Sequence, residues 1–428
     1  MSKNTLGFVN EEALAQALSC LSRLANLRLA YTRIGDAAAA ALAERLSALS
    51  TLTALSLSGN FIGHVGVQSL APALRHLPRL AALELESNGM GANSTAALAE
   101  HLSALTTLTA LRLSGSVPLE FEDGNILVAS SIEALPPVLR CLSRLADLRL
   151  CGYSIMASQA ASLAAALRGL TALTTLHLSA NRFGRNERGD GGTQVLALHR
   201  LSRLADLHLG DNNIGAAGAV VLAQPLGALT ALRALNLSDN RLGDAGVEAL
   251  APALRRLSQL AVLDLANNAI GAAGAAVLAQ PLGALTTLRA LKLSDNRFGD
   301  DGVEALAPAL SHLSRLAVLV LAFNAIGAAG ATALAQPLGA LAALTLLDLS
   351  ENRLGDAGAE SLAPALSRLS RLAVFWLQDN ELSDGSLVSL IPALACLTSL
   401  STLGLLRDND FSDAAAAQLR AIVRILEH

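Results

Sequence analysis

Two histidines in neighbouring stretches of similar sequence are the first residues whose types and spacing could do chemistry. His177 lies in TTLHLS and His208 in ADLHLG, so each follows a leucine at the same place in its stretch. If the two stretches form adjacent strands, the imidazoles lie roughly one strand spacing apart, about 4.8 Å, where they could bind a transition metal or titrate near neutral pH. Metal sites normally have three or four ligands. No third ligand has a suitable spacing and Arg149 lies on the flank, so we predict no metal here.

A row of acidic residues follows the same kind of stretch at five places, which are Asp211, Asp239, Asp295, Glu351 and Asp379. Carboxylates at that spacing could hold a divalent cation, but regularly spaced acids are also typical of a solvated rim, and we predict the rim. The sequence has no serine, histidine and aspartate grouping, no glycine-rich phosphate loop and no zinc pattern. We therefore predict that the protein is not an enzyme and requires no cofactor.

All of these residues lie in one unit that recurs along the chain with the pattern L-x-x-L-x-L-x-x-N-x-(I/L/F)-G. Its first leucine occurs at fourteen places, namely Leu24, Leu52, Leu80, Leu108, Leu145, Leu173, Leu204, Leu232, Leu260, Leu288, Leu316, Leu344, Leu372 and Leu400. Most consecutive copies are 28 residues apart, while Leu108 and Leu145 are separated by 37 and Leu173 and Leu204 by 31. In the second half, two versions alternate, SDNRxGDxGVEALAPAL and NAIGAAGAxxLAQPL, which gives a 56-residue period. Self-similarity at a fixed period of this length predicts a solenoid.

Each unit changes its hydrophobic period part of the way along. The L-x-x-L-x-L part has alternate apolar positions, as in a short strand with one buried face. In DAGVEALAPAL, Val247, Leu250 and Leu254 have the spacing of the apolar stripe of a helix, and we predict Asp244 as its N-cap. The proline of LAPAL or LAQPL cannot donate a backbone hydrogen bond, so we expect these helices to be short, kinked or broken near it.

An asparagine between strand and helix recurs in most units. We predict that it hydrogen-bonds backbone groups where each strand turns away, because buried backbone groups need partners. The column consists of Asn60, Asn88, Asn181, Asn212, Asn240, Asn268, Asn296, Asn324, Asn352 and Asn380.

The segment LRALNLSDNRLGDAGVEALAPAL resembles a leucine-rich repeat of the ribonuclease-inhibitor class, and the resemblance covers roughly residues 24–407. It implies an α/β leucine-rich-repeat solenoid, a horseshoe of about 14 repeats of 28 residues, with parallel strands on the concave face and helices on the convex face. Strands pack more closely than helices, which favours such curvature. The stretches GAAGAAVLA and GATALA are also similar to the GALA-type repeats of bacterial effectors. Those effectors carry an F-box before the repeats, and only about twenty residues precede this array, so we do not predict that activity.

Both ends of such an array need polar covers. We predict an N-terminal capping helix within residues 1–23 with Asn10 as its N-cap, the repeat array over 24–407, and a C-terminal capping helix within 408–425 with Ser412 as its N-cap. Residues 426–428, LEH, are interpreted as a vector-derived tag remnant.

The position between the last two leucines of each strand points away from the core, and we call these residues the face column. Copies that agree elsewhere differ here: Asn236, Lys292 and Asp348 occupy it in three closely similar repeats. The full column is Arg28, Ser56, Glu84, Arg112, Arg149, His177, His208, Asn236, Asp264, Lys292, Val320, Asp348, Trp376 and Gly404. Its first half is mainly basic and its second half acidic and apolar, which favours a protein partner with matching charges. Drift on a solvated face is the alternative.

Two aromatic residues add to this surface. Trp376 is the only tryptophan, and its register predicts an exposed side chain, although it could instead cover the C-terminal end of the core. Phe323 lies on the same side, just before Asn324. Exposed aromatic residues are frequent binding hot spots. We therefore predict the partner-binding residues Arg112, Arg149, His177, His208, Asp264, Lys292, Phe323, Asp348 and Trp376.

Two insertions break the period, at 116–131 and within 182–195, and long loops often carry function. The second contains Arg188, Gly189 and Asp190, an integrin-type tripeptide that we attribute to chance.

Composition excludes several classes of protein. The net charge is −4 and aromatic residues make up 3% of the chain, which argues against nucleic acid as a partner. The mean hydropathy is +0.47, and residues 316–347 carry no charge, yet Asn324, Gln336 and Pro337 interrupt that stretch, so we predict no membrane span. Acidic residues near the N-terminus leave no signal peptide of the usual kind. The four cysteines show no CxxC spacing and suit a reducing compartment, so we expect a cytoplasmic protein, with export without a cleavable signal left open.

The leading hypothesis is a monomeric, non-enzymatic scaffold that binds a protein partner on its concave face. One alternative is a GTPase-activating protein resembling the Ran activators built on this type of repeat, although those typically carry an acidic tail, which this sequence lacks. The others are a structural component of a larger assembly and a secreted effector.

Overall fold

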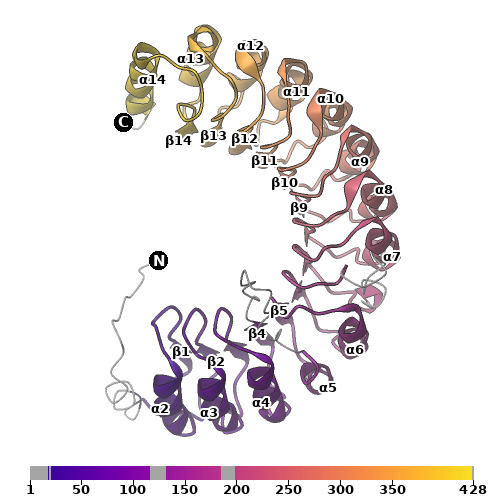
Figure 1. The fold of residues 1–428 in the computed structure, drawn as a ribbon, viewed down its shortest axis with the longest axis vertical. Coiled ribbons are helices and arrows are strands. Elements are labelled where there is room, and N and C mark those ends of the chain that lie inside the picture. Colours follow the sequence, from indigo (N-terminus) through magenta and orange to yellow (C-terminus); the bar gives the residue numbers. More distant parts are fainter. Residues whose placement is uncertain (1–17, 19–20, 116–131, 185–197, 427–428) are drawn as a thin grey trace, which may run out of the picture. The chain divides into compact units, whose positions relative to one another are not determined.

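The computed structural model describes residue 18 and residues 21–115, 132–184 and 198–426, which form two compact units. The units divide the chain at residues 1–212 and 213–428. In each unit the strands form one layer and the helices form a second layer beside it, as Figure 1 shows. The predicted N-terminal capping helix with Asn10 falls almost entirely outside the described residues, as do both insertions with Arg188 to Asp190.

Among the described residues of unit 1, seven short strands pair in parallel and in sequence order. These strands are β1 Asn26–Arg28, β2 Ala54–Ser56, β3 Ala82–Glu84, β4 Ala110–Ser114, β5 Asp147–Cys151, β6 Thr175–His177 and β7 Asp206–His208. The helices are α2 Asp36–Leu46, α3 His64–Leu74, α4 Ala92–Leu102, α5 Leu135–Leu139 and α6 Ala157–Leu167, with a 3₁₀ turn at Leu198–Arg200.

Unit 2 repeats the same plan. Its strands are β8 Ala234–Asn236, β9 Val262–Asp264, β10 Ala290–Lys292, β11 Val318–Val320, β12 Leu346–Asp348, β13 Val374–Trp376 and β14 Thr402–Gly404. Its helices are α7 Ala216–Gly227, α8 Gly243–Leu254, α9 Ala272–Ala284, α10 Gly299–Leu310, α11 Ala328–Ala340, α12 Gly355–Leu366, α13 Leu387–Ala395 and α14 Asp413–Leu426, with a 3₁₀ turn at Asp384–Ser386. Within the described residues, no helix is both long and apolar enough to cross a membrane.

The core lies between the two layers and consists mainly of the repeated leucines. Leu235 and Leu237 of one repeat have no exposed surface, and the helix residues Leu250 and Leu254 of the same repeat are 1% exposed. The strands thus bury the face that their apolar period of two predicts, and the helices bury the face that their apolar spacing of three and four predicts. Burial of each leucine side chain contributes about 1.5–3 kcal/mol, and each repeat completes its core only against its neighbours.

The asparagine column forms the predicted ladder of hydrogen bonds between repeats. Asn296 is typical: its Oδ1 accepts from the backbone N–H groups of Asn268 at 3.2 Å and Ile270 at 3.0 Å. Its Nδ2 donates to the carbonyl groups of Leu265, Leu293 and Ser294 at 3.0–3.1 Å. The amide satisfies backbone groups that the short strands leave open, which confirms the structural role predicted for the column.

The prediction of Asp244 as a helix N-cap is wrong. Helix α8 begins at Gly243 without a side-chain cap, and Asp244 lies in its first turn. The Asp244 Oδ1 instead accepts from the backbone N–H of Gly271, 2.6 Å away in the next repeat. Asp36, Asp300 and Asp356 make the corresponding bond across to the following repeat. A negative charge at the beginning of a helix is favourable, and these carboxylates also connect successive repeats.

The prolines do not break the helices. Helix α8 continues through Pro252 to Leu254, and helix α9 continues through Pro281 to Ala284. Each proline lies two or three residues before the helix end, so little helix remains to be disrupted. Pro252 has no N–H to donate to the carbonyl group of Glu248, four residues earlier. Because Glu248 is exposed, water can reach that carbonyl group. The helices are short, at 11–13 residues in most repeats.

The C-terminal helix α14 begins where the sequence predicts. The Ser412 Oγ accepts from the backbone N–H of Ala415 at 3.2 Å, which is the expected N-cap bond. The assignment of residues 408–425 as a protective end cap, and of residues 426–428 as a tag remnant, stays a prediction.

Candidate binding surface on the strands

The face column lines up within each unit as the repeat register requires. In unit 1 the pairing runs from Arg112 to Arg149, then to His177 and His208. In unit 2 it places Asp264, Lys292, Val320, Asp348 and Trp376 on successive strands. The structure therefore aligns the face-column residues predicted from the sequence within each unit. Their role in binding stays a prediction.

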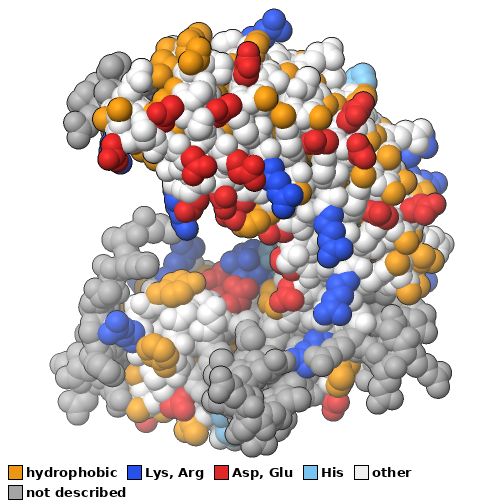
Figure 2. Space-filling model, turned by 45° about the horizontal axis from the view of Figure 1, so that its top comes forward, with side chains coloured by type: hydrophobic (Ala, Val, Ile, Leu, Met, Phe, Trp, Pro, Cys, Tyr) orange, Lys and Arg blue, Asp and Glu red, His pale blue; other side chains and the backbone are white. Residues whose placement is uncertain are grey.

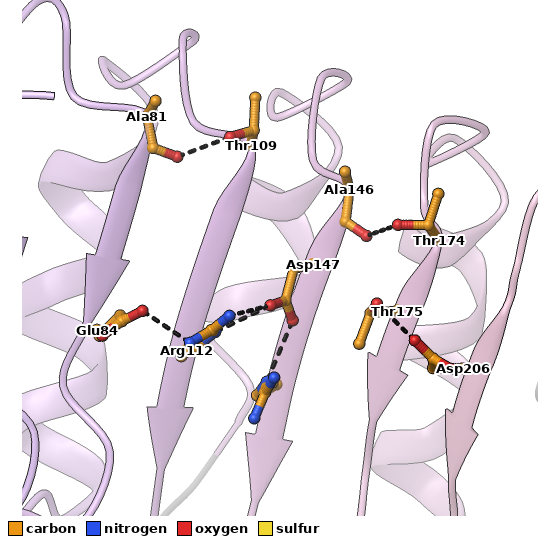
Figure 3. A network of polar contacts seen from close by, with 10 residues as sticks. Ala81, Glu84, Thr109, Arg112, Ala146, Asp147, Thr174, Thr175 and Asp206 are labelled. Atoms are coloured by element: carbon orange, nitrogen blue, oxygen red, sulfur yellow. Dashed lines mark hydrogen bonds and ion pairs between the residues drawn. The ribbon is translucent and has the colours of Figure 1, made fainter. Parts of the chain in front are cut away.

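A network of ion pairs holds the charged residues of unit 1 (Figure 3). Arg112 contacts Glu84 through Nη1 at 2.7 Å, and Asp147 through Nη2 at 2.6 Å and Nε at 2.9 Å. The other carboxylate oxygen of Asp147 accepts from the Nε of Arg149 at 3.2 Å. The side chains are 17–29% exposed, so the pairs are partly screened by water and mainly fix the orientation of the two guanidinium groups.

Asp147 is a member of this network that sequence reasoning missed. It lies two residues before Arg149 on the same strand, and alternate residues of a strand share a face. The strand position two residues before the face column is the signal in the sequence that points to it. Arg112, a predicted binding residue, already donates to Asp147 and Glu84. It therefore has fewer N–H groups free for a partner than the sequence indicates.

His177 and His208 stack against each other, with ring centroids 3.8 Å apart and an angle of 32° between the planes. Their nitrogen lone pairs lie in the ring planes, so stacked rings do not direct them to a common ion. Among the described residues, no group of three or more His, Cys, Asp or Glu side chains could hold a metal. Burial, together with the nearby His208, Arg149 and Arg112, lowers the pKa of His177 to about 4, against an opposing effect of Asp147.

Stability should depend on pH through His177. Its folded-state pKa of about 4 is below the ordinary value of 6.5, so on acidification the unfolded chain takes up the proton first. Stability is therefore lost as the pH falls from 6.5 towards 4 and is fully present above 6.5. Between pH 7.5 and 4.5 we expect the wild type to lose about 1–2 kcal/mol more than His177→Gln, after discounting for solvent screening. Urea unfolding at both pH values measures this, with His312→Gln at an exposed site as the control; equal losses in all three proteins would contradict the assignment.

Two acids of unit 2 are less accessible than predicted. Asp264 and Asp348 are both 7% exposed. Asp348 Oδ1 accepts from the backbone N–H of Ser350 at 3.0 Å and from its hydroxyl at 2.6 Å. Asp264 Oδ1 accepts from the N–H of Ala266 at 3.2 Å. Aspartate commonly bonds its own backbone two residues on, and these local bonds draw both carboxylates away from solvent. Both carboxylates are therefore less accessible than the sequence indicates, and their contact with a partner stays a prediction.

Lys292 is open to a partner. Its side chain is 47% exposed, and its Nζ lies 3.4 Å from Oδ2 of the buried Asp264. The pair keeps the ammonium group on the strand face while leaving much of it in water, where such a contact contributes at most about 1 kcal/mol.

The two predicted aromatic sites differ in exposure. Phe323 is 46% exposed, as expected. Trp376 is half-buried, which corrects the predicted exposure: its register is right, but it lines a cavity at the end of the sheet with Leu403 and Leu419.

Backbone geometry explains the row of acids. Asp211, Asp239, Asp295, Glu351 and Asp379 all have left-handed φ angles of 52–55°. Aspartate is among the residues that tolerate this region best, so the row has a conformational origin. Phe323 occupies the same position with φ 55°, where a bulky side chain is uncommon.

Comparison with known proteins agrees with this repeating architecture. A family model described as a leucine rich repeat matches residues 48–71, 204–223, 228–251, 260–279, 284–307, 314–335 and 343–363. A search of curated proteins found no match. Among solved structures, the crystal structure of an internalin from Listeria monocytogenes is similar over 95% of this chain and 92% of that chain, with a TM-score of 0.56 and 21% sequence identity.

At that identity the likeness to the internalin shows the fold alone. Neither comparison distinguishes the ribonuclease-inhibitor class or the GALA type, and both assignments stay predictions. The matched repeats, the parallel strands in sequence order and the asparagine ladder together show that the chain has the fold of a leucine-rich-repeat solenoid.

Proposed function

We propose that this protein is a non-enzymatic scaffold that binds a protein partner along the solvent-facing side of its strands. One observation carries the proposal: repeats that share their buried leucines differ in the face column. Leu235 and Leu291 have no exposed surface, while the following residues are the half-buried Asn236 and the exposed Lys292. Folding dictates the two leucines, whereas the two face-column residues meet solvent or a ligand.

The charged network of unit 1 suits recognition of a partner with matching charges. Its guanidinium groups are already oriented by Asp147 and Glu84, so binding would immobilise few additional side chains. Arg149 uses only its Nε in the described ion pair, which leaves its terminal N–H groups for an acidic group. Figure 2 shows acidic and basic side chains interspersed on the face that it draws, which fits complementary pairing more closely than attraction to a uniformly charged polymer.

The proposal includes a monomeric scaffold in the cytoplasm whose partner is a protein and not a nucleic acid. Support for a reducing compartment comes from Cys141, Cys151 and Cys396, which are free thiols.

A capture experiment followed by titration tests the strand face. A protein captured from lysate and identified by mass spectrometry should bind Arg149→Gln or Lys292→Gln at least tenfold more weakly than the wild type, or about 1.4 kcal/mol. Arg149→Gln removes a half-buried charge and Lys292→Gln an exposed one, and a complementary partner would contact both. The matched control is Glu304→Gln, which neutralises an exposed charge on helix α10. Unchanged binding by both strand-face variants, with a loss in Glu304→Gln, would place the partner on the helices and refute the proposal.

A further inference from the structure

A cavity of about 510 Å³ lies at the C-terminal end of the sheet in unit 2. Trp376 on β13, Leu403 and Leu405 around β14, and Leu419 on α14 form its apolar walls. Binding sites for small ligands commonly span about 300–1,000 Å³ and are mostly apolar with a few polar groups. The size and lining of this cavity therefore fit one apolar side chain together with the backbone that carries it.

Gly404 keeps the cavity open. It takes the face-column position of β14, next to Trp376. A Cβ there would lie 2.4 Å from Gln378 Oε1 and 2.9 Å from Trp376 Cδ1, which is too close for either contact. Absence of a side chain at this position lets Trp376 and Gln378 lie over the last strand.

Gln378 provides a hydrogen-bond acceptor on the cavity wall. Its Oε1 is buried and has no hydrogen-bond partner among the described residues. A buried polar atom without a partner costs about 1–3 kcal/mol. The side chain as a whole is only half-buried, and a ligand that brings an N–H group into the cavity would satisfy Oε1 once the side chain turns that atom towards the space.

The charged residues that line the cavity are both basic. They are Arg407 and Arg420. Arg407 Nε contacts Asp408 at 2.8 Å, with side chains 87% and 57% exposed, so that pair is weak and exchangeable. Arginine pairs with carboxylates through two parallel N–H bonds. The cavity thus combines an apolar space, an acceptor that lacks a donor, and two cations.

We propose that this cavity binds the free C-terminus of a partner protein whose last residue is apolar. Such a residue carries all three matching groups within a few ångströms: its side chain fills the space beside Trp376, its backbone N–H donates to Gln378 Oε1, and its carboxylate pairs with Arg407 and Arg420. An internal acidic residue would not place a carboxylate and an apolar side chain on the same Cα. The inference rests on the proposed function, since it assumes a protein partner, and it identifies the chemistry that one site would recognise.

Trp376 makes the test direct, because it is the only tryptophan in the chain. Its fluorescence should change saturably when an acetylated tripeptide ending in leucine is added to the full-length protein. The same tripeptide with a C-terminal amide, and one that ends in glycine, should bind at least tenfold more weakly. Equal binding of acid and amide would overturn the proposal, as would the absence of any saturable change. Decanoate is the third arm: tighter binding of decanoate than of the leucine peptide would assign the cavity to a lipid-like acid and also overturn it.

Two variants locate the binding. Arg420→Gln removes an exposed charge and should weaken the tripeptide at least tenfold, while Arg315→Gln, an exposed arginine outside the cavity lining, should have no effect. Gly404→Ala should abolish binding by pushing Trp376 and Gln378 into the space; should it fail to fold, Arg420→Gln still decides. If the tripeptide does not bind but Arg149→Gln still loses the captured partner, this inference fails and the proposed function stands. If the tripeptide binds and neither strand-face variant affects capture, this inference stands and the proposed function fails.

Discussion

Asn296→Ala should lower the free energy of unfolding by about 3–5 kcal/mol. The side chain is 7% exposed and makes five hydrogen bonds to the backbones of its own and the preceding repeat. Alanine replaces none of them, and each buried backbone group without a partner costs about 1–3 kcal/mol. Some of the carbonyl groups have other donors, so the loss is smaller than five full penalties.

Urea unfolding followed by circular dichroism measures this loss. The matched control is Asn93→Ala, at an exposed position of helix α4, where we expect a change within about 0.5 kcal/mol. Solenoids can unfold in parts, so hydrogen exchange at the Ile270 amide, which donates to Asn296 Oδ1, provides a local readout. An Asn296→Ala protein within 1 kcal/mol of the wild type, with an unchanged Ile270 exchange rate, would show that water replaces the side chain at little cost.

The strands, the helices and the asparagine ladder could be predicted from the sequence because each depends on a pattern within one repeat. Leucines with a period of two and then of three to four determine which face is buried. Asn296 could be identified because a polar residue that recurs between two buried segments must serve the backbone there. The repeat period also predicts that Lys292 on β10 and Trp376 on β13 lie on one face of the sheet, three strands apart.

The wrong predictions concern side chains whose contacts lie in the next repeat or only two residues further along the chain. Asp244 looks like a helix cap because capping is a local rule, yet its partner is Gly271 in the next repeat. Asp348 looks outward by register, but a local bond to Ser350 turns it back. Trp376 looks exposed because its register says nothing about β14, where Gly404 lets it lie against the cavity. The candidate site was therefore predictable in position but not in accessibility.

The carboxylate link between repeats also accounts for the alternation of two repeat versions. One version supplies the aspartate and the next supplies a glycine-rich helix start to receive it. Asp300 Oδ1 accepts from the backbone N–H groups of Gly327 at 2.6 Å and Gly330 at 2.9 Å. A side chain at Gly330 would occupy the place of that carboxylate, because its Cβ would lie 2.6 Å from Asp300 Oδ1 and 2.7 Å from Ile326 Cγ2. The two versions are thus matched halves of one contact, and the 56-residue period follows.

Gly330→Ala should accordingly destabilise the protein by about 1–3 kcal/mol, the range for an added methyl group in a packed site. Gly339→Ala, in the same helix α11, is the matched control: its Cβ would have no neighbour closer than 3.6 Å, and removal of a helical glycine should stabilise by about 0.4–1 kcal/mol. Both are measured by urea unfolding. Asp300→Ala combined with Gly330→Ala should cost less than the sum of the two single changes, because the clash with the carboxylate disappears. Equal effects of Gly330→Ala and Gly339→Ala would mean that α11 shifts to accommodate the methyl group, and the matching of repeat versions would then need another cause.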